Sequence, residues 1–96
     1  MSIETLVREK RNEILRIAEL HGAYNVRLFG SVARGEAGPQ SDVDFLIDAG
    51  EKTSSWFPGG LVVDLEELLG RRVDVVEEVA LRPELRPYVL RDAKPL

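Results

Sequence analysis

Two short groups of residues are separated by ten positions in the stretch GSVARGEAGPQSDVDFLID, residues 30–48. The first group is the turn-prone pair Gly30 and Ser31, and the second is Asp42 and Asp44, separated by one residue. Residues two apart on a strand point to the same sheet face, with Cα atoms about 6.5 to 7 Å apart, so these carboxylates can converge on one divalent cation. Magnesium is the hard cation that one or two carboxylates plus substrate phosphates typically hold. The spacing therefore indicates a magnesium site.

The residues around the glycine-serine pair can supply the phosphate contacts of such a site. Gly30 lets the backbone approach a ligand closely. Amides at the start of the following turn, together with the Ser31 hydroxyl, can hydrogen-bond an anionic group. Arg34 lies one helical turn onward and can pair with the same phosphates. Phosphate donors beside a carboxylate-held cation indicate a nucleoside-triphosphate site.

A third carboxylate, Asp74, lies in a later segment that reads RVDVVE, residues 72–77. Its alternation places Val73 and Val75 on the core face of a strand and Asp74 on the polar face. There it could share the metal, or orient and deprotonate an attacking hydroxyl. Taken alone, each aspartate is more typical of a solvated acid on a wet sheet face. The glycine-serine pair favours the functional interpretation.

The elements that position these residues follow from the spacing of apolar residues and from the glycine and proline stops between them. The order is α-β-β-α-β-α, with a brief helical turn at 32–34, which predicts an α/β (α+β) layer structure whose helices cover one side of a small sheet. The predicted helices are 3–21, 61–69 and 84–92, and the predicted strands are 24–29, 42–48 and 72–77. Pro87 must lie in the first turn of the last helix or delay its start.

Composition narrows the class of protein. With 96 residues, the chain is expected to form a single domain, 1–96. It has no cysteine and no apolar run of the roughly 20 residues that span a bilayer, which favours a cytoplasmic protein without membrane contact. The formal net charge of -4 argues against stable nucleic-acid binding, which usually needs a basic surface.

The motifs together resemble a known family. Gly30-Ser31, ten intervening residues and Asp42-Val43-Asp44 resemble the GS-x10-D-x-D signature of the DNA polymerase β-like nucleotidyltransferase superfamily. The fuller string, with the later LEELLGRRVDVV, resembles most closely the minimal nucleotidyltransferases known as MNT or MntA-like antitoxins. The recognisable motifs run from about Val26 to Val76, and the order and distances of GS, RGE, SDxD and GRxVD make the resemblance specific.

The resemblance implies a minimal nucleotidyltransferase fold with a small mixed sheet, and an activity. Members of this family pair with a helical HEPN-domain toxin and transfer AMP from ATP to a tyrosine of that partner. Carried over to this chain, Gly30 and Ser31 would bind the triphosphate, Asp42 and Asp44 would hold Mg²⁺, and Asp74 would be the third acidic residue and metal ligand. Arg34 is a further expected phosphate contact.

The chain departs from larger nucleotidyltransferases, which add a helical domain that grips the acceptor or the base. The acceptor surface is then expected to come from a partner or a second copy, in a homodimer or a mixed complex. Trp56 and Phe57, in a glycine- and proline-flanked loop, could belong to such a contact or could cap the core. Two other functions remain open: an antitoxin that acts by occlusion without catalysis, and nucleotidyl transfer to a small molecule such as an antibiotic.

Overall fold

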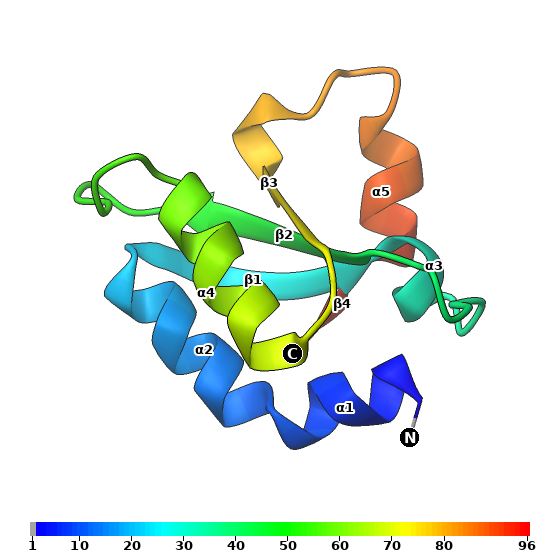
Figure 1. Ribbon diagram of the computed structural model, residues 1–96. Coiled ribbons are helices and arrows are strands. Elements are labelled where there is room, and N and C mark those ends of the chain that lie inside the picture. The colour runs from blue at the N-terminus through cyan, green and yellow to red at the C-terminus, as the bar shows by residue number, and fades with distance from the viewer. Residues whose placement is uncertain (1) are drawn as a thin grey trace.

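The computed structural model describes residues 2–96, which form a mixed sheet with helices around it (Figure 1). The strands follow the order β3-β2-β1-β4, where β1 is antiparallel to β2 and β4, and β2 is parallel to β3. Their bounds are β1 Ala23–Phe29, β2 Val43–Ala49, β3 Val73–Glu77 and β4 Lys94–Pro95. The mixed sheet confirms the predicted architecture. The sequence did not predict β4, because two residues carry no alternation to detect.

The helices are α1 Ile3–Glu9, α2 Arg11–Leu20, α3 Gly30–Ala33, α4 Gly59–Leu69 and α5 Arg86–Asp92, with a 3₁₀ turn, η1, at Glu78–Ala80. The single helix predicted for 3–21 is wrong, because the chain bends at Lys10, which ends α1 and precedes α2. The bend lets α1 reach α3 while α2 packs on β1 and α4. The apolar residues before and after Lys10 both have helical spacing, so the sequence pattern does not predict the bend.

The hydrophobic core lies on the sheet face that α2 and α4 cover. Val43, Phe45 and Ile47 alternate along β2 and are buried there, as the sequence predicted. Leu61 and Leu65 of α4 complete this layer. No helix within residues 2–96 is long and apolar enough to cross a membrane.

The C-terminal segment lies on the side of β1 and β2 opposite α2 and α4 (Figure 1), so the prediction that the helices cover one side of the sheet does not hold for α5. Helix α5 contacts β1 and α3, and none of its residues joins the core cluster. It begins at Arg86, with Pro87 in its first turn, so the proline delays the predicted start at Glu84 as the sequence allowed. Leu46 alternates with Phe45 and is fully buried on this second face. The second sheet face is therefore partly covered, and its charged residues are not freely solvated.

The loop after β2 is held against the end of α2. His21 hydrogen-bonds Ser54 through Nδ1 at 2.6 Å and Asp64 through Nε2 at 2.7 Å. The Ser54 amide donates in turn to the His21 carbonyl. Within this loop Phe57 packs against the core, whereas Trp56 is 77% exposed. Phe57 thus has the core role that the sequence left open, and Trp56 does not share it.

Candidate active site

The glycine that opens the candidate site is required by its backbone and by its neighbour. Strand β1 ends at Phe29, which pairs with Asp44 of β2, and Gly30 follows with φ +74°. A Cβ atom on Gly30 would lie 2.3 Å from the Asp44 carboxylate oxygen Oδ2, closer than any real contact allows. Only glycine combines this left-handed backbone with such a close approach. The first residue of the predicted glycine-serine pair thus lies against one of the predicted carboxylates, Asp44.

Ser31 is the second residue of the short helix α3 and is half-buried. Its carbonyl accepts from the Glu36 amide, which closes the turn that carries the motif. The first amides of a helix have no acceptor within the helix and can turn to an anionic ligand. The predicted helical turn at 32–34 thus begins two residues earlier, at the motif itself.

Asp44 and Asp74 lie side by side on neighbouring strands. The parallel register of β2 and β3 pairs the two residues directly. The pKa of Asp44 is raised to about 6, chiefly by burial and then by the negative charges of Asp74 and Asp42, against the opposing effect of nearby Arg34. Carboxylates that crowd in this way are stabilised by a cation. The oxygen ligands and the crowding both fit magnesium.

Asp42 is placed differently from its prediction. Strand β2 begins at Val43, whose amide donates to the Arg72 carbonyl, so Asp42 precedes the strand and is exposed. Its Oδ1 lies 3.0 Å from Nε of Arg72, a residue that the sequence analysis did not single out. Among residues 2–96, no three acidic or histidine side chains are already gathered closely enough to hold a metal. Asp42 would therefore exchange Arg72 for a metal ion in order to join Asp44 and Asp74.

Arg34 lies at the end of α3 between two carboxylates. Its Nε is 2.9 Å from Glu36, and its Nη1 is 2.9 Å from Asp92 at the end of α5. These hydrogen bonds, first that of Glu36 and then that of Asp92, raise the pKa of the guanidinium. The predicted phosphate contact is thus near Asp44 and already oriented by acidic neighbours. Asp92 could not be found from the sequence, because only the fold brings α5 to α3.

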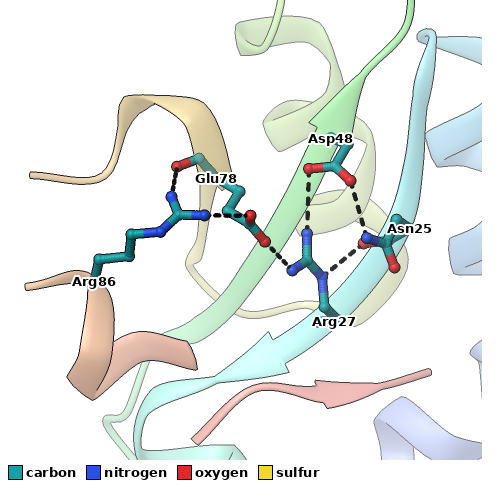
Figure 2. A network of polar contacts seen from close by, with 5 residues as sticks. All are labelled: Asn25, Arg27, Asp48, Glu78 and Arg86. Carbon is teal, nitrogen blue, oxygen red and sulfur yellow. Dashed lines mark hydrogen bonds and ion pairs between the residues drawn. The ribbon is translucent and has the colours of Figure 1, made fainter. Parts of the chain in front are cut away.

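A second charged group on this sheet face was also missed (Figure 2). Arg27 of β1 is only 8% exposed and contacts Asp48 of β2 and Glu78 of η1. Glu78 also accepts from Arg86 of α5 at 2.8 Å, while Asn25 donates to Asp48 at 2.9 Å. The hydrogen bond from Arg27, followed by the weaker contribution of Arg86, lowers the pKa of Glu78. An arginine inside the apolar strand YNVRLF was the one signal available in the sequence.

Comparison with known proteins agrees with this geometry. Residues 8–95 match the family described as "Nucleotidyltransferase domain". The chain is 36% identical to MJ0435 of Methanocaldococcus jannaschii, which is named as a protein adenylyltransferase. The match covers 91% of this chain and 94% of that protein. It is 38% identical to protein adenylyltransferase MntA of Thermococcus cleftensis, over 94% and 88% of the two chains.

Solved structures share the fold. A structure described as a minimal nucleotidyltransferase is 49% identical, with a TM-score of 0.86 over 100% of this chain and 97% of that chain. A toxin-antitoxin structure with AMP-PNP has a TM-score of 0.72 at 24% identity over 91% of this chain and 69% of that chain, a likeness of fold alone. By sequence and by fold, this chain belongs to the nucleotidyltransferase domain family.

Proposed function

We propose that this chain is an antitoxin that transfers AMP from ATP to a tyrosine hydroxyl of a HEPN-domain toxin, in a magnesium-dependent reaction that neutralises the toxin. The observation that carries the proposal is the contact of Gly30 with Asp44, beside Asp74 on the next strand. The turn that we propose to bind phosphate then lies against the crowded carboxylates. The relatives named protein adenylyltransferase favour AMP as the transferred group.

The residues of the candidate site would have separate roles in the reaction. Gly30 and the first amides of α3, with the Ser31 hydroxyl, would bind the triphosphate, and Arg34 would contact the same phosphates. Asp44 and Asp74 would hold magnesium with Asp42. When bound, the metal supplies positive charge against the charge that develops on the leaving pyrophosphate. The protein then accelerates the reaction by positioning and by electrostatics.

Proton transfer falls to Asp74. A tyrosine hydroxyl of the partner would attack the α-phosphorus in line, forming the new P–O bond while the bond to pyrophosphate breaks. Asp74 is exposed on β3, so an incoming hydroxyl can approach it and lose its proton there. Asp44 is more buried and suits the metal better than the acceptor.

The acceptor surface is proposed to come from a second protein. The match with this chain covers 94% and 88% of the two adenylyltransferase relatives, which leaves no room in them for an additional acceptor domain. Chains of this fold occur in solved toxin-antitoxin complexes, one of them described as MntA-HepT. Trp56, which is exposed on the loop after β2, is a candidate contact for the partner.

The proposal is tested by incubating the protein with magnesium, ATP labelled at the α-phosphate and the product of the adjacent toxin gene. We expect label on the partner's tyrosine, its loss with a chelator, and its loss in Asp42→Asn or Asp44→Asn. Asp48→Asn is the matched control, because it removes a carboxylate from the same strand outside the site. Stable complex formation without label would show occlusion instead, and label on a low-molecular-weight compound would show a small-molecule acceptor.

A further inference from the structure

The C-terminal helix packs against α3 and reaches the candidate nucleotide site through an ion pair. Asp92, the last residue of α5, accepts from Nη1 of Arg34 at 2.9 Å across 58 residues of sequence. The Asp92 side chain is only 16% exposed, compared with 42% for Arg34. The carboxylate is therefore partly removed from water, and Arg34 is its closer cation, since Arg91 lies 3.7 Å from its other oxygen.

The other end of α5 is held independently. Arg86, its first residue, donates to the carbonyl and the carboxylate of Glu78, and Glu78 accepts from the buried Arg27 of β1 (Figure 2). These charged contacts matter for the placement of α5, since it contributes no residue to the core cluster. The helix is thus placed by ionic contacts at both ends, and its position fixes that of Asp92.

We propose that Asp92 is a positioning residue that orients Arg34 toward the phosphates of the nucleotide, which makes α5 part of the nucleotide site. This inference rests on the proposed function. A guanidinium has five donors in a rigid plane, and Glu36 and Asp92 engage Nε and Nη1, so further donors remain for phosphate oxygens. Two carboxylates fix the plane before the ligand arrives, which removes part of the ordering cost of binding.

Alternatively, Asp92 could compete with phosphate for Arg34, or could only stabilise the packing of α5. The three roles predict different results in a binding assay. A positioning residue strengthens nucleotide binding, a competitor weakens it, and a purely structural residue affects stability without affecting affinity through Arg34.

The test measures the dissociation constant of ATP with magnesium, by calorimetry, in Asp92→Asn, Arg34→Ala and the double variant. We expect about tenfold weaker binding for Asp92→Asn, as for other residues that orient a ligand-binding group. The double variant should bind no more weakly than Arg34→Ala alone, because Asp92 acts through Arg34. Asp92→Glu should restore part of the affinity. Glu84→Gln, an exposed change just before α5, is the matched control and should bind as the wild type does.

Three results would overturn the inference while leaving the proposed function intact. They are unchanged affinity in Asp92→Asn with only a lower melting temperature, tighter binding in that variant, and equal losses from Asp92→Asn with and without Arg34. A wild-type protein that binds no ATP would instead refute the proposed function itself, and this inference with it.

Discussion

Two groups of carboxylates lie on one face of the sheet, and their surroundings shift carboxylate pKa values in opposite directions. At one end, Asp48 and Glu78 flank the buried Arg27, and the pKa of Glu78 is lowered. At the other, Asp44 is crowded by Asp74 and Asp42, and its pKa is raised to about 6. Both groups lie on elements of the same sheet, so the difference arises from their partners.

The partners of the Arg27 group indicate a structural role, and those of the Asp44 group indicate a functional one. The Arg27 group carries its own compensating charge and ties η1 and α5 to the sheet, as a structural ion network does. In the Asp44 group, Arg72 pairs with the exposed Asp42, and Asp44 lies against a glycine with no room for a side chain. Perturbed carboxylates in such a setting are typical of active sites.

The largest expected effect is the loss of AMP transfer in Asp44→Asn. Removal of a metal-binding carboxylate from a phosphoryl-transfer site should lower the rate by at least about 100-fold. Asp48→Asn, four residues along β2, should retain most of the rate. Initial rates of label transfer under matched conditions measure both. Equal losses of transfer rate in the two variants would show that the Asp44 group is no more important for catalysis than the Arg27 group.

The next effect is on stability. Arg27→Met leaves Asp48 without its cation and Glu78 with Arg86 alone. The change should cost about 2 to 3 kcal/mol in the free energy of unfolding, less than for a fully buried pair. Urea unfolding followed by circular dichroism measures this cost. A variant as stable as the wild type would show that the Arg27 group does not hold the C-terminal segment.

Gly30→Ala should impair catalysis more than it impairs folding. The new Cβ would displace the Asp44 carboxylate, and such a shift of a catalytic group should lower the rate by about tenfold relative to the control. Gly35→Ala is that control, because Gly35 has nearly the same φ, +73°, and open space around it. Both variants should lose about 1 kcal/mol of stability from backbone strain. Equal rates in the two variants would show that the contact with Asp44 is unimportant.

The smallest effect is a pH dependence of the metal-free protein. The folded-state pKa of Asp44, about 6, exceeds its ordinary value of 3.8, so the folded state binds the proton more tightly. The contribution of Asp44 to stability is then greatest below pH 3.8 and is lost as the pH rises through 6. Asp44→Asn should therefore be more stable than the wild type at pH 8, by about 1 kcal/mol after allowance for solvent screening.

Urea unfolding of both proteins at pH 4 and pH 8, without divalent cations, measures this difference. The advantage of Asp44→Asn should be small at pH 4, where the wild-type carboxyl is protonated in the folded state. An advantage that did not change with pH would mean that the Asp44 carboxylate is not destabilised by its neighbours.

The sequence predicted the parts of the fold that depend on local pattern. The alternation around Phe45 and the contrast between Val73 and Asp74 were sufficient to place two strands and their faces, and β2 and β3 proved to be neighbours. The contact between Gly30 and Asp44 was implied by the motif, although its closeness was not. The charged partners Arg72 and Asp92 could not be predicted, because their contacts depend on how distant segments pack.

The most direct test of the central claim is a calorimetric titration of ATP with magnesium into the wild type, Asp44→Asn and Asp48→Asn, with folding of each checked by circular dichroism. We expect the wild type and Asp48→Asn to bind with similar affinity, and Asp44→Asn to bind at least about tenfold more weakly. Unchanged binding in Asp44→Asn, or a loss confined to Asp48→Asn, would contradict the central claim.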